Sequence, residues 1–335
     1  MTKLPTKLLM LMLAMMIAAI LLTACAQKGA GTSVTNAGGK SQELTKVRFA
    51  NLAVGLDSIP HMLAVEKGIF AKYGIDLQVV NFPKGGAEAT AGVASGQVDM
   101  GSYGTPILTG ISRGLPIKIV ASPPVKDIPF VLVGKKGINS VQELKGKTVA
   151  TGALGGGSHQ SFLKILAGNG LRESDVKVVS TGGTDAELIL RSGKVDAVIT
   201  SEPLVTKLEK DGVGTVLARA YDYYGKYQHS YVLATDKFIQ SNPDIIRNFL
   251  KASRESHEYA RDHLEELVAY ASKTINLDEG LIREYYQKQF VRWDLSFKVD
   301  IEGTENAVNI VKDMKEIESN VVFDKDKWLD LRFLE

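Results

Sequence analysis

A repeated segment constrains the fold of this chain more than any other feature of the sequence. A glycine pair, a Ser-Gly-x-Val-Asp pentapeptide and a proline recur in the same order, and corresponding residues lie 97 positions apart without a gap. The copies are Gly85-Gly86-Ala87-Glu88-Ala89, Ser95-Gly96-Gln97-Val98-Asp99 and Pro106, then Gly182-Gly183-Thr184-Asp185-Ala186, Ser192-Gly193-Lys194-Val195-Asp196 and Pro203. Chance gives one short match, but a register kept from Gly85 to Pro106 predicts two similar halves.

Each half alternates between strand and helix patterns. The expected strands are 47–52, 75–82 and 98–102 in the first half, and 147–151, 176–180 and 195–200 in the second. The expected helices are 58–67, 87–94, 105–114, 158–168, 185–191 and one opened by Glu202-Pro203. Strands that alternate with helices predict a mostly parallel sheet flanked by helices in each half.

Two apolar runs, Pro129 to Val133 and Tyr231 to Thr235, are placed to cross between the halves. The chain after them turns helical, with an amphipathic helix opened by Asn242-Pro243 and another over Leu264–Ile275. We assign this tail to the first lobe. The expected domains are 46–131 with 231–335 as lobe 1 and 132–230 as lobe 2, with a cleft between them.

The start of the chain is typical of a secretory signal peptide, because Lys3 and Lys7 precede the apolar run from Leu8 to Leu22. Leu22-Thr23-Ala24-Cys25 makes this segment similar to a bacterial lipoprotein signal. We therefore expect residues 1–24 to be removed, Cys25 to carry lipid, and 25–45 to form a flexible tether. An ordinary signal peptide or an uncleaved anchor is the alternative. The expected location is the extracytoplasmic face of the cell membrane.

Composition excludes several classes of function. The chain has 40 basic and 38 acidic residues, and removal of Lys3 and Lys7 brings the two into balance, so nothing indicates nucleic-acid binding. Cys25 is the only cysteine, which leaves no thiol for catalysis or for a cysteine metal site once it is lipidated. We expect no cofactor and no metal.

Four strand-to-helix turns are the candidate ligand site, because ligands of open parallel sheets bind beyond the carboxyl ends of the strands. Unpaired amides and the helix dipole at each turn favour an anion. The candidate binding residues there are Leu56, Asp57, Ser58, Tyr103, Gly104, Thr105, Gly156, Gly157, Ser158, His159 and Glu202. Ser58, Thr105 and Ser158 are expected N-caps, and capping alone also explains them.

The charges in these turns limit the ligand. They hold no Lys or Arg, which suits a sulfonate bound by neutral donors, while Asp57 and Glu202 suit an ammonium or an amino-heterocycle. Alternatively, Asp57 caps its own helix and Glu202 pairs with a framework cation. His159 is a candidate donor or a buried structural histidine. Tyr231, with Tyr221, Tyr223, Tyr224 and Tyr227, forms either an aromatic wall or hinge packing.

Several motifs resemble periplasmic binding proteins for nitrate, sulfonate and taurine. They are Leu63-Ala64-Val65-Glu66-Lys67-Gly68-Ile69-Phe70 with Tyr73-Gly74-Ile75, Ser95-Gly96-Gln97-Val98-Asp99-Met100-Gly101, Val141-Gln142-Glu143-Leu144-Lys145-Gly146-Lys147-Thr148-Val149-Ala150, and Ser201-Glu202-Pro203. Gly157-Ser158-His159-Gln160 is similar to the Ser-His-Asn turn of aliphatic-sulfonate binders.

This resemblance implies an α/β, two-lobed periplasmic binding protein fold of type II, with two crossing strands between mostly parallel sheets. It implies a monomeric lipoprotein that captures an aliphatic sulfonate or taurine and delivers it to an ABC permease and its ATPase. The alternative ligand is a thiamine-type pyrimidine, another small heterocycle or nitrate. We expect no enzymatic activity, because no nucleophile–base–oxyanion arrangement is visible and histidines are few.

Overall fold

The computed structural model describes residues 33–35, 41–52, 55–82, 85–125, 128–152, 154, 156–181 and 186–334. The expected signal peptide and Cys25 lie outside the described residues, as do Gly155 and residues 182–185. The chain forms two units, 1–45 and 46–335. In the first unit, β1 (Ser33–Thr35) pairs antiparallel with β2 (Ser41–Glu43), within the segment expected to be a flexible tether. Across the described residues, no helix combines the length and apolarity needed to cross a bilayer.

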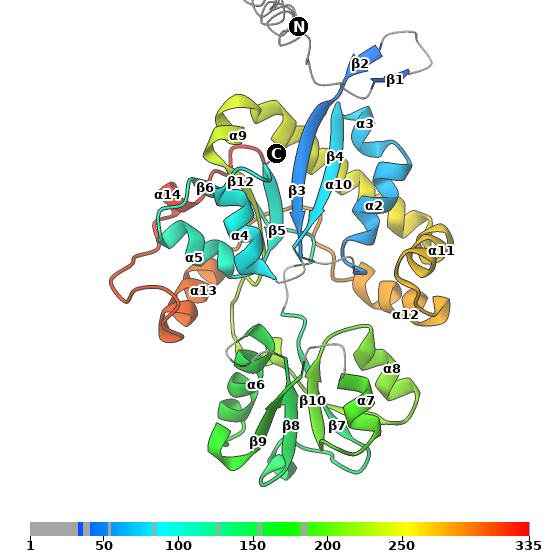
Figure 1. Ribbon diagram of the computed structural model, residues 1–335, viewed down its shortest axis with the longest axis vertical. Coiled ribbons are helices and arrows are strands. Elements are labelled where there is room, and N and C mark those ends of the chain that lie inside the picture. Colours follow the sequence, from blue (N-terminus) through cyan, green and yellow to red (C-terminus); the bar gives the residue numbers. More distant parts are fainter. Residues whose placement is uncertain are drawn as a thin grey trace, which may run out of the picture. The chain divides into compact units, whose positions relative to one another are not determined.

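A first five-stranded sheet has the strand order β4-β3-β5-β12-β6 (Figure 1). Its strands are β3 (Thr45–Asn51), β4 (Ile75–Asn81), β5 (Met100–Tyr103), β6 (Ile117–Ala121) and β12 (Tyr231–Thr235). β3 and β5 are parallel, with Phe49 opposite Met100. β12 runs antiparallel to both β5 and β6, with Leu233 opposite Gly101 and Ile119.

Helices cover both faces of this sheet because its strands bury alternate residues on opposite sides. Val47 and Phe49 pack with α2, α3 and α10, whereas Ala50 packs with α4, α5, α13 and α14. These helices are α2 (Ile59–Glu66), α3 (Ile69–Lys72), α4 (Gly86–Ala94), α5 (Pro106–Ser112), α10 (Pro243–Asp262), α13 (Ile301–Asp313) and α14 (Lys325–Trp328). The short α9 (Asp236–Ser241) follows β12. We call this part lobe 1.

Two further helices belong to lobe 1. α11 (Leu264–Ile275) and α12 (Glu279–Phe290) pack with α2 and the end of α10 in a separate apolar cluster. Leu63, Leu267 and Tyr286 lie in its centre. The expected bounds of α11 are confirmed, and the helix opened by Pro243 is α10.

A second five-stranded sheet has the order β11-β7-β10-β8-β9. Its strands are β7 (Val131–Lys135), β8 (Thr148–Thr151), β9 (Lys177–Ser180), β10 (Ala197–Thr200) and β11 (Gly214–Arg219). β8, β9 and β10 are parallel, and β7 is antiparallel to β10 and β11. Its main helices are α6 (Gly157–Gly168), α7 (Ala186–Arg191) and α8 (Leu204–Lys210), and the short helical turns are η1 (Gln142–Leu144), η2 (Glu173–Asp175) and η3 (Ala220–Tyr223). We call this part lobe 2.

The expected α/β fold with two mostly parallel, helix-flanked sheets is confirmed, and the two strand orders correspond to each other. One detail of the expectation is wrong. The runs 129–133 and 231–235 supply β7 and β12, the antiparallel strand of each sheet, rather than the crossings themselves. The chain passes between the sheets before them, after β6 ends at Ala121 and after β11 ends at Arg219.

Candidate functional site

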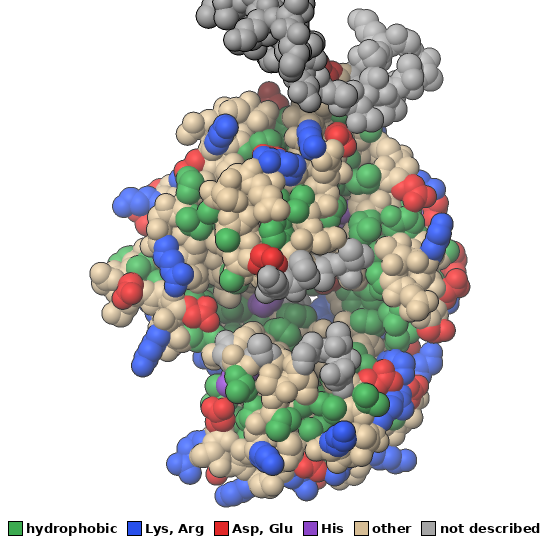
Figure 2. Space-filling model, viewed as in Figure 1, with side chains coloured by type: hydrophobic (Ala, Val, Ile, Leu, Met, Phe, Trp, Pro, Cys, Tyr) green, Lys and Arg blue, Asp and Glu red, His purple; other side chains and the backbone are tan. Residues whose placement is uncertain are grey.

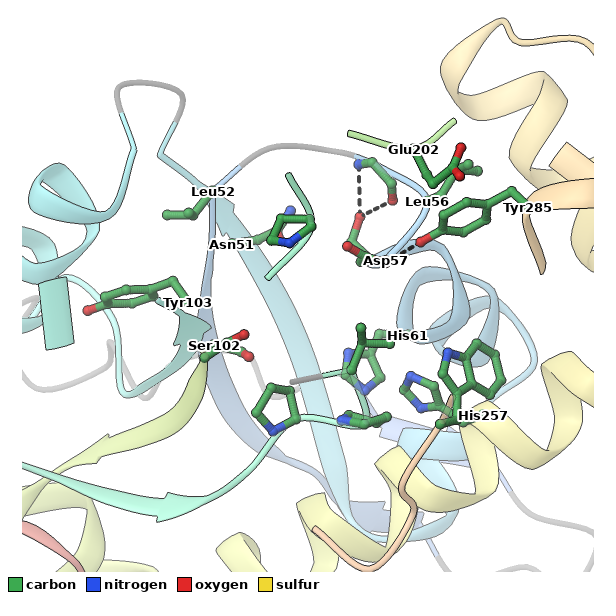
Figure 3. A pocket seen from close by; sticks show the side chains of 18 of the residues that line it. Asn51, Leu52, Leu56, Asp57, His61, Ser102, Tyr103, Glu202, His257 and Tyr285 are labelled. Atoms are coloured by element: carbon green, nitrogen blue, oxygen red, sulfur yellow. Dashed lines mark hydrogen bonds between the residues drawn. The ribbon is translucent and has the colours of Figure 1, made fainter. Parts of the chain in front are cut away.

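A pocket of about 530 Å³ opens where lobe 1 faces the start of α8 of lobe 2. This volume is in the range of small-molecule sites. Figure 2 shows the surface hollowed between the two lobes, and Figure 3 shows the pocket itself. Its described walls are largely apolar and aromatic, and include Phe49, Leu52, Tyr103, Tyr286 and Trp293.

Six of the residues expected from the sequence line this pocket. They are Leu56, Asp57, Ser58, Tyr103, Gly104 and Glu202. The other six are not among its described lining residues: Thr105, Gly156, Gly157, Ser158, His159 and Tyr231. The pocket therefore assembles the turns after β3 and β5 with the turn after β10, while the described part of the turn after β8 stays outside it.

The turn after β8 is held by its own framework. The N-cap of α6 is Gly156, so the expectation that Ser158 caps this helix is wrong. Ser158 lies inside α6, and its Oγ accepts a hydrogen bond of 3.1 Å from the amide of Gly152. His159 is buried, with Nε2 3.2 Å from Oε1 of Glu173. Ser158 and His159 therefore both contact other residues of lobe 2.

The tyrosines near the return to lobe 1 are packing residues. Tyr231 is fully buried, and its hydroxyl donates to the carbonyl of Gln228 at 3.0 Å. Tyr224 and Tyr227 pack against each other at a ring-centroid distance of 4.7 Å. None of the tyrosines from Tyr221 to Tyr231 is a described lining residue of the pocket, which agrees with the hinge-packing alternative.

Asp57 is the first of two acids at the pocket (Figure 3). The Tyr285 hydroxyl, carried by α12, donates to its Oδ1. Although Asp57 is open to the pocket, the surrounding protein displaces much of its water. This desolvation raises the pKa of the Asp57 carboxyl, and the Tyr285 hydrogen bond acts in the opposite direction. Burial first, and the charge of Asp57 next, raise the pKa of Tyr285 well above its usual value, so it remains a donor.

Glu202 is the second acid, and it lies across from Asp57 at the start of α8. Its Oε2 accepts a hydrogen bond of 3.0 Å from the amide of Thr206, which orients the carboxylate at the first turn of the helix. Neither acid forms an ion pair with a described residue, and the described lining contains no Lys or Arg. The alternative pairing of Glu202 with a framework cation is therefore wrong for the described part of the chain.

The N-cap expectations for the turns of lobe 1 are met in position but not in bonding. Ser58 is the N-cap residue of α2 and Thr105 that of α5, yet neither side chain accepts a hydrogen bond from a backbone amide of its helix. The Ser58 hydroxyl instead donates to the carbonyl of Gly55 at 2.8 Å, which tightens the loop beside Asp57. Gly104 meets the crossing segment closely, because a Cβ there would lie 3.2 Å from the carbonyl oxygen of His229.

A histidine pair lines another side of the pocket and was not expected. Nε2 of His61 lies 2.6 Å from Oγ of Ser253, and Nδ1 of His257 lies 2.7 Å from the carbonyl oxygen of the same serine. Burial lowers the pKa of His61 to about 3 and that of His257 to about 4. Trp293 contacts His257 edge-to-face at a centroid distance of 4.7 Å.

The residues that sequence reasoning missed come almost entirely from the helical tail. Tyr285 and Tyr286 lie on α12, and His257 lies on α10. Trp293, just after α12, is half-buried and lines the pocket. The amphipathic pattern of α10 locates its buried face, but only tertiary packing decides that part of this face borders a cavity.

The chain matches the family model described as "NMT1/THI5 like" over residues 56–267, which is more than half of its length. The chain belongs to this family. It is 25% identical to a putative binding protein of Brucella abortus over 223 residues, covering 65% of this chain and 68% of that protein. It is 28% identical to the 4-amino-5-hydroxymethyl-2-methylpyrimidine phosphate synthase THI5 of Saccharomyces cerevisiae over 256 residues, covering 71% and 74%.

A solved structure confirms the fold. The periplasmic aliphatic sulphonate binding protein SsuA of Escherichia coli superposes with a TM-score of 0.70 at 23% identity, covering 82% of this chain and 94% of that one. The NMT1/THI5-like chain therefore has the periplasmic binding protein fold, as the motifs of the sequence implied. The relatives of this chain include a putative binding protein and a pyrimidine phosphate synthase, so similarity alone leaves the ligand to be argued from the pocket.

Proposed function

We propose that this protein is an extracytoplasmic solute-binding protein that captures a small, flat nitrogen heterocycle bearing an amino group and delivers it to an ABC importer. It acts as a binder rather than an enzyme, and lipid on Cys25 holds it at the membrane. The fold, the pocket between two lobes and the names of several relatives support the solute-binding role. Lobe closure over the ligand is the expected delivery signal.

One observation carries the ligand class. The described pocket has two acids without described ion-pair partners, aromatic walls and no Lys or Arg. An amino or protonated ring nitrogen that donates to Asp57 or Glu202 offsets their desolvation, and the flat ring packs against Tyr286 or Trp293. The charge of a free anion would instead be repelled by both carboxylates.

The aliphatic sulfonate expected from the sequence is the second candidate. Leu56, Asp57 and Ser58 lead directly into α2 and line the pocket, so the dipole-positive end of this helix faces the cavity. The sulphonate-binding SsuA of Escherichia coli shares the fold and supports this alternative. A zwitterion such as taurine combines a sulfonate with an ammonium group for the acids.

Titration calorimetry on the purified full chain distinguishes these ligands. The panel is 4-amino-5-hydroxymethyl-2-methylpyrimidine, taurine and methanesulfonate, each tested on the wild type and on Glu202→Gln. We expect the pyrimidine to bind most tightly, and Glu202→Gln to weaken it about tenfold or more, since hydrogen bonds to charged groups contribute roughly 1.5–3 kcal/mol. If methanesulfonate binds more tightly than the pyrimidine and Glu202→Gln has no effect, the proposal of a heterocyclic ligand is wrong and the sulfonate is favoured.

The membrane anchor has its own test, because Cys25 lies outside the described residues. Cys25→Ala is expected to release the protein from the membrane fraction while leaving ligand binding unchanged. Retention of the Cys25→Ala protein at the membrane contradicts anchoring through a lipid on this residue.

A further inference from the structure

We propose that His61 and His257 form a neutral donor–acceptor pair in the pocket wall, positioned by Ser253, that recognises one edge of the ligand. The edge it fits has a hydrogen-bond acceptor next to an N–H donor, as in a ring nitrogen beside an amino group. This inference rests on the proposed function and deepens it, because it names which atoms of the heterocycle are recognised and by which side chains.

The hydrogen bond of His257 to Ser253 shows which of its two ring nitrogens can accept a hydrogen bond from the ligand. Its Nδ1 lies 2.7 Å from the carbonyl oxygen of Ser253, and a carbonyl can only accept, so Nδ1 carries the proton. Nε2 of the neutral ring is then an acceptor. It has no hydrogen-bond partner among the described residues, although His257 is only 4% exposed and lines the pocket. An acceptor without a described partner on a residue of the pocket wall can be paired by a donor that enters the pocket.

Ser253 also determines which ring nitrogen of His61 carries the proton and can donate to the ligand. Ser253 is 1% exposed, and Nε2 of His61 is the described partner of its hydroxyl, at 2.6 Å. If the His61 ring donated, the buried hydroxyl proton would have no acceptor, at a cost of about 1–3 kcal/mol. The hydroxyl therefore donates to Nε2, and His61 carries its proton on Nδ1. This Nδ1 has no described hydrogen-bond partner, and His61 lines the pocket.

The packing around the two rings keeps this pattern in place. The ring centroids of His61 and His257 are 5.1 Å apart with planes at 88°. Phe49, Phe70 and Phe249 surround His61, and Trp293 contacts His257. The low pKa of both histidines keeps the rings neutral at physiological pH, so one donor and one acceptor remain. Figure 3 shows both residues on the same side of the cavity, away from Leu52 and Tyr103.

The first test reads the tautomers directly in the full chain. Nitrogen-15 NMR of labelled histidine, assigned with His61→Gln and His257→Gln, is expected to show neutral rings protonated on Nδ1 at both positions at pH 7. A proton on Nε2 of either ring, or a charged ring, contradicts the inference. Ser253→Ala removes the hydroxyl but keeps the carbonyl, so it is expected to disturb the tautomer of His61 and leave that of His257 unchanged.

The second test compares two probes by calorimetry. 4-Aminopyrimidine has the acceptor–donor edge, and 4-methylpyrimidine has nearly the same shape without the donor. We expect the wild type to prefer the amino compound at least tenfold, and His257→Phe to reduce this preference to about twofold. The matched control is His263→Phe, at the end of the same helix, where His263 stacks on Tyr259 and lies outside the described pocket lining.

The outcomes separate this inference from the proposed function. A preference that persists in His257→Phe shows that the acids alone recognise the amino group, and it overturns the inference while leaving the proposed function intact. A wild-type protein that binds neither pyrimidine contradicts the proposed ligand, and the inference falls with it. Loss of the preference in His257→Phe, with the control like the wild type, supports both.

Discussion

Lobe 1 and lobe 2 have corresponding sheets, yet lobe 1 supplies most of the described pocket lining. The strand order β4-β3-β5-β12-β6 corresponds to β9-β8-β10-β7-β11, with one antiparallel strand in the same place in each sheet. Lobe 2 contributes Glu202 and Pro203 to the described lining. Pro129, which lies just before β7, also lines the pocket. The repeat therefore reproduces a scaffold rather than a binding site.

The repeated aspartate shows what the two halves share. Oδ2 of Asp99 accepts from the amide of Arg48 at 3.0 Å, and Oδ2 of Asp196 accepts from the amide of Thr148 at 2.9 Å. A cation also binds each acid, Arg48 at 2.7 Å in lobe 1 and Lys135 at 2.6 Å in lobe 2. Asp99 thus ties the start of β5 to β3, and Asp196 ties the start of β10 to β8, away from the pocket.

The helix starts show what the halves do not share. Ser58 is the N-cap of α2 and lines the pocket, whereas Ser158 lies inside α6 and is bound to Gly152. Ser158 lies two residues past the N-cap of its helix, so its side chain points in another direction than that of an N-cap serine.

Acid stability is the largest difference that we expect between the lobes. The pKa values of the lobe 1 histidines, about 3 for His61 and about 4 for His257, lie below the ordinary 6.5. The unfolded chain therefore binds protons that the folded chain does not. The free energy of unfolding falls as the pH drops from about 6.5 toward 4, by an amount on the order of several kcal/mol for the two histidines together.

Urea unfolding at pH 7 and pH 4.5 measures this loss. His257→Asn is expected to make the loss smaller by about 2 kcal/mol, whatever its effect at pH 7. An equal acid loss in His257→Asn and the wild type contradicts the prediction.

Ligand affinity is the second way to test the comparison. Asp57→Asn in lobe 1 is expected to weaken 4-amino-5-hydroxymethyl-2-methylpyrimidine about 10- to 100-fold, because it removes a charged acceptor. Ser158→Ala in lobe 2 is expected to change the affinity less than twofold, since Ser158 bonds Gly152 outside the described lining. Calorimetry on both variants decides between the lobes, and a larger effect of Ser158→Ala would reverse our assignment.

The shared aspartates predict matching losses of stability. Asp99→Asn and Asp196→Asn should each lower the free energy of unfolding by about 1–2 kcal/mol, because each weakens charge-assisted bonds to a strand amide and a cation. Urea unfolding at pH 7 measures both, and Asp262→Asn on the exposed end of α10 is the control. If only one of the two variants is destabilised, the halves are not equivalent at this position.

The smallest effect concerns a link between the lobes. Nζ of Lys288 on α12 donates to Oγ1 of Thr206 on α8 at 2.8 Å. Lys288 is about half exposed, so Lys288→Met is expected to cost only about 0.5 kcal/mol and to change ligand affinity about twofold. Calorimetry should show that Lys288→Arg retains the affinity. A tenfold loss in Lys288→Met would mean that this contact governs how the lobes meet.

Much of the scaffold was predictable from the sequence, because hydrophobic periodicity and turn residues are local signals. The alternation of strands and helices, the repeat and the span Leu264–Ile275 all follow from such patterns. The antiparallel direction of β7 and β12 was not predictable, since a short apolar run has the same pattern in either direction.

The site was predictable only where it lies at strand ends. Asp57 and Glu202 follow β3 and β10 and were expected in the cleft, and both line the pocket. His257 and Tyr285 come from helices whose apolar faces first indicate core packing, and Trp293 follows the second of these helices. Whether such a face packs against another helix or borders a cavity depends on segments far away in the sequence. A local sequence pattern therefore does not predict it.

The hydrogen bond from the Thr206 amide fixes the Glu202 carboxylate before the proposed ligand binds. Because the helix already holds this carboxylate in place, the acid needs no rearrangement when a molecule arrives. The Glu202 side chain then loses little conformational entropy when the proposed ligand binds. For the proposed ligand, Glu202 therefore adds no side-chain rearrangement of its own to the binding step.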